Sequence, residues 1–429
     1  MFDLLIKNAR LAGATDSLDI GIKDGKIKSL RRNIETQATQ VIDAQNNFVT
    51  SPFVDPHFHL DATLSYGQPR VNQSGTLLEG IELWGELKPT QTVEDFRDRA
   101  LEFCQWSIAR GTLGLRSHVD ITDDRLLAVE ALVDVREKMK PYMDIQLVAF
   151  PQDGFLRTPQ SKANLLKALD MGVDVVGGIP HFERTMDDGA SSIRQLCEIA
   201  AERGLLVDMH CDESDDPHSR HIESLSAETV RLGMEGRVTG SHLTSMHSMN
   251  NYYVSKLMPL MSEAEIHVVA NPLINITLQG RHDTYPKRRG MTRVKELVNA
   301  GINVAFGHDC VMDPWYSLGS HDMLEVAGMG LHVGQMTGVA EIQSCFDAVT
   351  CNGAKAMHLE GYGIETGNNA DLVILDCQSA FDAIRLRPAR LQVIRHGRII
   401  SQTAKAHPQV MLDGESREID FVPSGMKSA

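Results

Sequence analysis

The sequence predicts an α/β protein, a (β/α)8 TIM-type barrel with a small β domain built from both chain termini. Apolar runs of strand length recur eight times through the middle of the chain, and helical patterns separate them. Short alternating strands occupy the first fifty residues and the C-terminal region. Eight strands that alternate with helices are the number that closes such a barrel.

The eight runs are apolar along their length, as strands of a parallel sheet are when helices cover both of its faces. In chain order they cover residues 53–59, 111–120, 145–154, 174–181, 204–213, 236–245, 265–273 and 301–310. The stretch between the first two shows a helix start, with Thr92 as the cap and Glu94 and Asp95 in the first turn. We therefore expect residues 51–366 to form the barrel.

The two ends of the chain have a different pattern. Residues 18–30 alternate polar and apolar side chains around Asp24-Gly25, a pair that favours a hairpin turn. Residues 370–376 and 390–401 also have the pattern of short strands, and the second segment turns at His396-Gly397. We expect residues 1–50 and 367–429 to form one small β domain.

Composition limits the class of protein. The 429 residues are 42% hydrophobic and 23% charged, which is ordinary for a globular protein, and no apolar run is long enough to span a membrane. The N-terminus lacks the layout of a secretory signal. Seven scattered cysteines indicate free thiols in a reducing compartment, so we expect a cytoplasmic protein.

The net charge of −15 argues against nucleic-acid polymers and anionic membrane surfaces as partners. The chain nevertheless contains one basic cluster, Lys287-Arg288-Arg289. It is either a solvated loop or a group with a local role at the active site, and the sequence leaves both open.

Polar residues gather where the predicted strands end, which is where barrels of this class carry their chemistry. The first run ends in His57 and His59, an H-x-H pair whose imidazoles face one side of an extended chain. Later runs end in further polar residues, namely Gln152, His210 with Glu213 beyond it, His242, and His308-Asp309.

Three of these histidines and one carboxylate predict a metal site. We assign His57, His59, His210 and Asp309 as ligands of one divalent ion, because neutral imidazoles with a carboxylate suit Zn(II) or Fe(II). Such an ion lowers the pKa of a bound water from about 16 toward about 7, which makes hydroxide available at neutral pH.

Other residues at the strand ends suit proton transfer. Glu213 lies beyond the expected ligand shell and can carry a proton from water to a ring nitrogen. His242 can polarise the water or stabilise the oxygen of a tetrahedral intermediate. We interpret His118, His181 and His308 as orienting groups.

Long segments make the chain recognisable. It resembles the bacterial cytosine deaminases of the amidohydrolase superfamily nearly from end to end. The segments that carry the resemblance are PHFHLD, GQPRVNQSGTLLEGIELW, VAFPQDG, GIPHFE, HCDESDD, SHLTSMHS, ANPLINITLQGRHDTYPKRRG and FGHDCVMDPWYSLG.

The resemblance implies hydrolytic deamination of a free cytosine-type base to uracil or thymine and ammonia. It implies one Fe(II) or Zn(II) on the four ligands, Glu213 as proton shuttle, and His242 and Asp309 as activators of the water. It also implies Gln152 as a ring-binding amide, with Leu77 and Trp315 lining the base pocket. A homo-oligomer is implied as well.

One position departs from the family pattern. Those deaminases carry a second aspartate directly after the metal-binding one, and this chain has Cys310 there. A small, weakly hydrated thiol leaves room for an apolar substituent at the pyrimidine 5-position. We therefore expect 5-methylcytosine to be accepted as well as cytosine, the alternative being neutral drift. We discount Cys310 as a nucleophile.

Other functions remain to be distinguished. Zinc deaminases of the other architecture need a C-x-x-C motif, and the chain has none. The runner-up is a deaminase of another small heterocycle, such as isocytosine, isoguanine or a triazine, or a hydrolase of cyclic amides. A non-catalytic ligand-binding barrel is the least favoured, because all the ligands and Glu213 are present.

Overall fold

The computed structural model describes residues 1–14 and 16–423, and its centre is a sheet of eight parallel strands. The strands follow chain order around the sheet, and each lies within or beside one of the eight predicted runs. They are β6 (Phe53–Phe58), β7 (Thr112–Asp120), β8 (Asp144–Phe150), β9 (Val175–Gly178), β10 (Leu206–Cys211), β11 (Val238–His242), β12 (His267–Ala270) and β13 (Asn303–Phe306). The prediction of a (β/α)8 barrel is confirmed.

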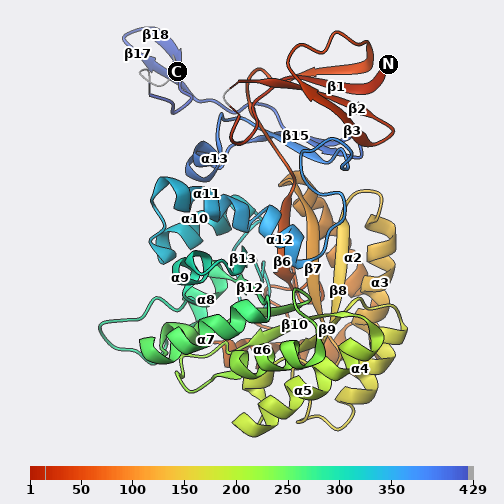
Figure 1. Ribbon diagram of the computed structural model, residues 1–429, viewed down its shortest axis with the longest axis vertical. Helices are drawn as coiled ribbons and strands as arrows, with labels where there is room; N and C mark the ends of the chain where they lie inside the picture. Colours follow the sequence, from red (N-terminus) through yellow and green to blue (C-terminus); the bar gives the residue numbers. More distant parts are fainter. Residues whose placement is uncertain (15, 424–429) are drawn as a thin grey trace.

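Helices surround this sheet (Figure 1). Helix α2 begins after Thr92, whose hydroxyl and the carboxylate of Asp95 cap each other's backbone amides, as the sequence predicted. The helices are α1 (Leu77–Leu87), α2 (Val93–Ala109), α3 (Leu127–Met139), α4 (Ser161–Asp170), α5 (Met186–Arg203), α6 (His221–Leu232), α7 (Asn251–Glu263), α8 (Pro272–Leu278), α9 (Val294–Asn299), α10 (Met323–Gly334), α11 (Val339–Ala348), α12 (Cys351–Ala356) and α13 (Ala380–Leu386). Short 3-10 turns are η1 (Lys88–Thr90), η2 (Pro180–Phe182) and η3 (Thr244–His247). No described helix has the length and apolar character needed to cross a membrane.

Both termini contribute to small sheets above the barrel (Figure 1). The first holds β1 (Phe2–Ala9), β2 (Leu18–Lys23), β3 (Lys26–Arg31) and β4 (Ala38–Asp43). In the second, β5 (Phe48–Thr50) from the N-terminal part pairs with β14 (Leu372–Leu375), and β15 (Arg390–Arg395) and β16 (Arg398–Gln402) complete it. One apolar cluster unites side chains of both ends, so neither end buries this core alone. We propose residues 1–50 and 367–429 as the bounds of this domain.

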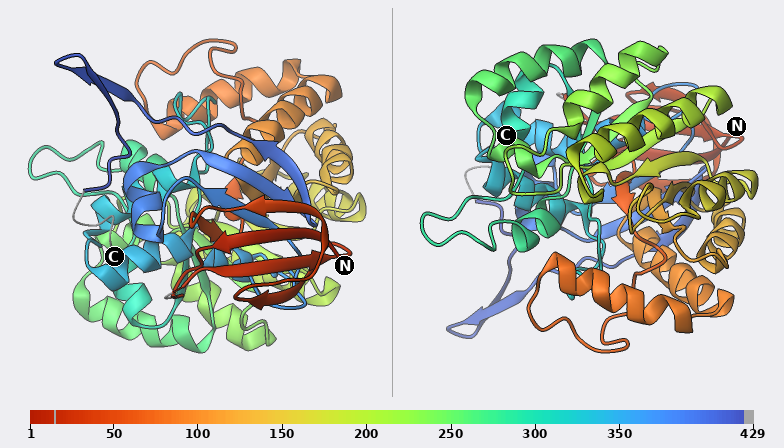
Figure 2. Two further views of the ribbon diagram at one scale, coloured as in Figure 1. Left: turned by 90° about the horizontal axis from the view of Figure 1, so that it is seen from above. Right: turned by 90° about the horizontal axis from the view of Figure 1, so that it is seen from below.

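A last hairpin stands apart from these sheets. It consists of β17 (Gln409–Leu412) and β18 (Glu415–Glu418), which pair only with each other, and it projects from the molecule (Figure 2, left). All eight residues of its two strands are exposed.

The barrel closes where its first and last strands meet. The His59 amide donates to the Asp309 carbonyl at 3.1 Å, and the Asp309 amide donates to the His57 carbonyl at 2.9 Å. Gly307 makes this approach possible, because a Cβ there would lie 2.9 Å from the His57 carbonyl oxygen. We call this junction of β6 with the chain after β13 the seam.

A buried carboxylate joins the two sides of the seam. Asp55 accepts hydrogen bonds from the amides of His57 (3.1 Å) and His308 (3.2 Å), one on each side of the seam. Its second oxygen lies 2.9 Å from Nε2 of His321, whose Nδ1 lies 2.7 Å from the Ser107 hydroxyl. All of these side chains are buried.

We expect Asp55→Ala to destabilise the metal-free protein by about 3 kcal/mol or more, because several buried donors lose their acceptor at once. Urea unfolding followed by circular dichroism measures this difference. Asp170→Ala is the control, since Asp170 is an exposed partner of Arg203, and it should cost less than about 1 kcal/mol. Equal losses in both variants would contradict the role given to Asp55.

Candidate active site

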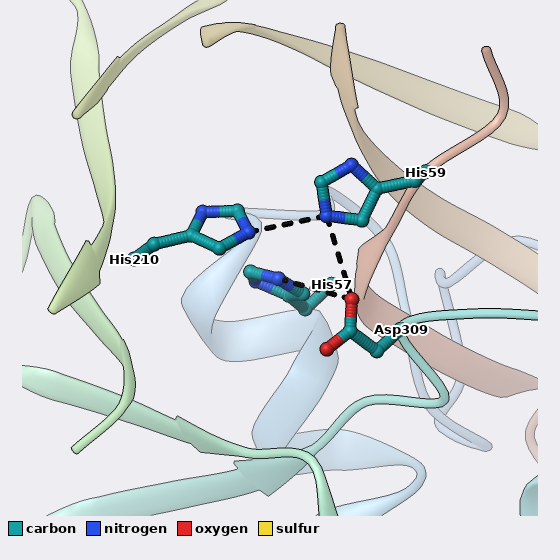
Figure 3. A group of neighbouring side chains, drawn as sticks. All are labelled: His57, His59, His210 and Asp309. Carbon is teal, nitrogen blue, oxygen red and sulfur yellow. Dashed lines mark hydrogen bonds and ion pairs between the residues drawn. The ribbon is translucent and has the colours of Figure 1, made fainter. Parts of the chain in front are cut away.

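Four side chains from three places in the barrel converge on one point (Figure 3). His57 lies on β6, His59 directly follows it, His210 lies on β10, and Asp309 follows β13. Their ligand atoms lie within 4.8 Å of one another, and all four side chains are buried. The structure thus brings together the four residues predicted as metal ligands.

The distances within this cluster fit a shared cation. Nε2 of His59 lies 3.1 Å from Nε2 of His210 and 3.4 Å from Oδ1 of Asp309, and Nε2 of His57 lies 3.6 Å from the same oxygen. Neighbouring ligand atoms at about 2.1 Å from one ion lie about 3.0–3.6 Å apart when the ion holds four protein ligands and a water. Nε2 of His57 is buried without a hydrogen-bond partner, which also fits a role as a metal ligand.

Burial sets the protonation of the cluster. It lowers the pKa of His59 to about 4 and moves the pKa of His57 and His210 well below the usual value, so the imidazoles are neutral and can act as ligands. Burial, and then the charge of nearby Glu213, raises the pKa of the Asp309 carboxyl. A bound cation would reverse that effect on Asp309.

His242 and Glu213 lie beside the cluster. Nδ1 of His242 is 3.4 Å from Oε1 of Glu213, and its Nε2 is 3.8 Å from Oδ2 of Asp309. Burial raises the pKa of Glu213 to about 8, so this carboxyl holds its proton at neutral pH. His242 and Asp309 both have left-handed backbone, at φ 72° and 71°, a strained conformation that is common at functional sites.

Two asparagines that the sequence analysis did not assign hold His242. The amide of Asn275 lies 2.9 Å from Nδ1 of His242, and that of Asn271 lies 3.3 Å from the same atom. The Asn271 amide also lies 3.4 Å from Nε2 of His242. Because an amide NH2 can only donate and the shortest contact, from Asn275, goes to Nδ1, we assign Nδ1 as the acceptor and place the proton of His242 on Nε2, toward Asp309. Both asparagines lie in the quoted segment ANPLINITLQG, yet nothing in that segment indicated their partner.

A cavity of about 190 Å³ opens over the cluster. It is smaller than the roughly 300–1,000 Å³ of sites for drug-sized ligands, so it suits a small ring. Predicted residues that line it are Leu77, Gln152, Glu213, His242, Cys310 and Trp315, and lining residues without a predicted role are Leu78, Ile81, Ile179, Phe182, Ser214, Ile274 and Leu278. The predicted pocket residues therefore share one cavity with the cluster.

Helix α1 forms one wall of this cavity, at the end of the barrel opposite the terminal sheets (Figure 2, right). Gly80 of α1 packs directly on Trp315, since a Cβ there would lie 2.3 Å from the indole ring. The Trp84 indole and the Lys88 ammonium both donate to Asp120, at 2.8 and 2.9 Å, which fixes the end of the helix on β7.

The three histidines interpreted as orienting groups lie in different places. The ring of His118 packs on His57 with centroids 4.1 Å apart, beneath the cluster. His181 lines the cavity. His308 points away from the cluster, and its Nδ1 lies 2.9 Å from the Cys310 carbonyl, which holds the backbone of Cys310.

The fold agrees with comparisons to known proteins. Residues 40–406 match the model of the Amidohydrolase family. The chain belongs to the amidohydrolase family. Its predicted resemblance to that superfamily, and its assignment as a metal-dependent hydrolase, are confirmed.

Several amidohydrolases are similar over almost the whole chain. The structure of 5-methylcytosine deaminase from Klebsiella pneumoniae, liganded with 5-fluorocytosine, matches with a TM-score of 0.92 and 43% identity over 95% of this chain and 99% of that chain. N-isopropylammelide isopropyl amidohydrolase from Pseudomonas sp. (strain ADP) is 30% identical over 93% of this chain and 97% of its own. Pterin deaminase from Rhizobium rhizogenes (strain K84 / ATCC BAA-868) is 27% identical over 90% and 88%.

The raised pKa of Glu213 has a consequence for stability. The folded protein holds this proton up to about pH 8, whereas an exposed glutamate releases it near its usual value of 4.5. In metal-free protein, the Glu213 contribution to the free energy of unfolding is therefore present below about pH 4.5 and lost as the pH rises toward 8. We expect Glu213→Gln to make the metal-free protein less sensitive to pH in this range. Urea unfolding at several pH values measures it, and parallel curves for the two proteins would contradict it.

Proposed function

We propose that the protein hydrolytically deaminates a free cytosine-type base, cytosine and 5-methylcytosine, to uracil or thymine and ammonia. The observation that carries this proposal is the small cavity in which a neutral, buried Glu213 and the Gln152 amide face the His and Asp cluster. The 43% identity to a 5-methylcytosine deaminase supports it.

The cluster would hold one divalent ion, Fe(II) or Zn(II), on His57, His59, His210 and Asp309. Such an ion, when bound, supplies a water of lowered pKa for attack on the ring. The donor set supports both metals equally, since imidazole and carboxylate bind either one.

Glu213 would move the protons. Deamination adds water at the ring carbon that carries the amino group, places a proton on the neighbouring ring nitrogen, and breaks the carbon–nitrogen bond so that ammonia leaves. A carboxyl that is neutral at pH 7 can give its proton to that ring nitrogen and recover one from the attacking water. It can then give that proton to the amino group and take the last one from the new hydroxyl, so that ammonia leaves, a carbonyl forms and the carboxyl is neutral again. His242, with its proton on Nε2, would donate a hydrogen bond to the oxygen that develops charge.

The other lining residues would select the ring. The Gln152 amide can donate to and accept from the lactam edge together. Leu77 and Trp315 would form apolar walls. Burial raises the pKa of the Cys310 thiol well above its usual value, so this side chain is uncharged where a carboxylate is usual. It would therefore adjoin the 5-substituent without excluding a methyl group.

A second candidate is deamination of another small heterocycle, such as isocytosine, isoguanine or a triazine. This candidate is kept because two relatives of the chain are named for other heterocycles, N-isopropylammelide and pterin. The size of the cavity favours a single ring over a pterin.

We also propose that the protein acts as a homo-oligomer in the cytoplasm. The seven cysteines are free and six of them are buried, which supports a reducing compartment. The β17–β18 hairpin supports an oligomer, because an isolated two-stranded hairpin is only marginally stable in water. It also exposes Met411 by 77% and Leu412 by 69%, and a second copy of the chain could cover these side chains.

The substrate proposal is tested by a panel of free bases with ammonia detection. We expect activity on cytosine and 5-methylcytosine, and we expect Cys310→Asp to lower kcat/KM for 5-methylcytosine relative to cytosine by about 10-fold, the range that one methyl group in a fitted pocket allows. If Cys310→Asp leaves the ratio of kcat/KM for 5-methylcytosine to that for cytosine unchanged, the role given to Cys310 is wrong. Activity on only the other heterocycles would favour the second candidate.

The oligomer proposal is tested by light scattering after size exclusion. We expect the double change Met411→Ser and Leu412→Ser to lower the mass of the particle or to make it dependent on concentration. Tyr252→Ser is the control, because Tyr252 is 84% exposed on α7. A wild-type protein that is monomeric throughout would contradict the proposal.

A further inference from the structure

Lys287, Arg288 and Arg289 lie in the long loop between α8 and α9, which extends beside α7 (Figure 1). Arg288 is the best connected of the three. Its Nε and Nη2 donate to the two carboxylate oxygens of Asp283 at 2.6 and 2.7 Å. Its Nη1 donates to the Asp215 carbonyl at 2.8 Å and to the Ser248 hydroxyl at 2.6 Å.

These partners belong to three different loops at the mouth of the barrel. Asp215 lies two residues after Glu213 in the loop after β10, Ser248 follows η3 in the loop after β11, and Asp283 lies in the loop after α8. The Asp215 carboxylate also accepts from the Gly280 amide at 2.8 Å. One guanidinium therefore ties the segment that carries Glu213 to its two neighbours.

The opposite side of that segment is fixed as well. The Thr244 hydroxyl donates to the Ser214 carbonyl at 3.1 Å, and the Ser245 amide donates to the Asp212 carbonyl at 3.0 Å. Residues 212–216 thus lie between η3 on one side and the loop with Arg288 on the other. Removing Arg288 would loosen the side of its own loop, where the bond from the Gly280 amide to Asp215 remains, while the contacts with η3 stay unchanged.

A site for an external anion is the rival interpretation of the basic cluster. The four hydrogen bonds of Arg288 go to protein atoms, and its side chain is 29% exposed. The Arg288 guanidinium lowers the pKa of Asp283 to about 2, so both side chains are ionised and their charges pair with each other. Its planar fork suits the bidentate contact with Asp283, and lysine cannot reproduce it.

We propose that Arg288 is a positioning residue for Glu213. It holds residues 212–216 against the cavity by joining the three mouth loops, and it thereby fixes the carboxyl that transfers the proton. This inference rests on the proposed function, since it assigns Glu213 that transfer. It also gives one residue of the basic cluster, Arg288, a role at the active site without contact to substrate.

The test compares Arg288→Gln and Arg288→Lys with Arg289→Gln. Arg289 is the matched control, because its guanidinium donates to the Val333 carbonyl, away from residues 212–216. We expect Arg288→Gln to lower kcat for cytosine by about 10-fold or more, since a displaced reacting group costs up to about 100-fold, while KM changes by less than about threefold. Arg288→Lys should fall between wild type and Arg288→Gln, and Arg289→Gln should stay within about twofold of wild type.

Hydrogen exchange and metal content give readouts that do not depend on turnover. Arg288→Gln should speed amide exchange in residues 212–216 and leave the metal content per chain unchanged, and Arg289→Gln should change neither. A kcat within about twofold of wild type, unchanged exchange in residues 212–216, or equal effects in Arg289→Gln would overturn the inference. If wild type deaminates no base in the panel, the proposed function fails. Unchanged amide exchange in Arg288→Gln would still overturn, by itself, the inference that Arg288 holds residues 212–216. If Arg288→Gln does not fold, the same criteria apply to Arg288→Lys.

Discussion

The seam between the first and last barrel strands is the constraint on which the active site depends. Two backbone hydrogen bonds join Asp309 to His57 and His59, and Asp55 accepts amides from both sides of that junction. Three of the four proposed ligands therefore lie at the seam, and only His210 comes from elsewhere. Because the ligands belong to the closure itself, their geometry is as rigid as the barrel. Sites that rest on strand ends gain this precision, which sites on free loops lack.

Burial is the second organising influence, and it acts on every titratable group in the cavity in the same direction. It favours neutral imidazoles and neutral carboxyls, so the cluster, Glu213 and Cys310 all lose charge together. A carboxyl that keeps its proton at neutral pH is a proton donor by virtue of its surroundings alone. The same desolvation opposes a bare charge at this place, so a cation bound there must be stabilised by its bonds to the ligands and by the charge of Asp309.

Much of the site could be read from the sequence because parallel strands leave a clear signal. Buried runs mark the strands, and polar residues at their ends mark the catalytic face, so the sequence predicts His57, His210 and Asp309. The contacts of Asn275 with His242 and of Arg288 with Asp215 left no such signal. Their partners lie 33 and 73 positions away, and only the register of strands and the path of loops bring them together. The boundary between the two domains is also weakly marked, since β5 and β14 share one sheet.

The seam also decides when the active site can first exist during synthesis. Asp55 and His308 are 253 positions apart, so the H-x-H pair leaves the ribosome long before the strand that completes the ligand set. A nascent chain can offer two histidines to an ion but cannot enclose it. Full coordination must wait until the last barrel strand has been made and inserted, and metal acquisition then reports that the barrel has closed. In the cell, the loaded ion would thus mark chains whose first and last barrel strands have met.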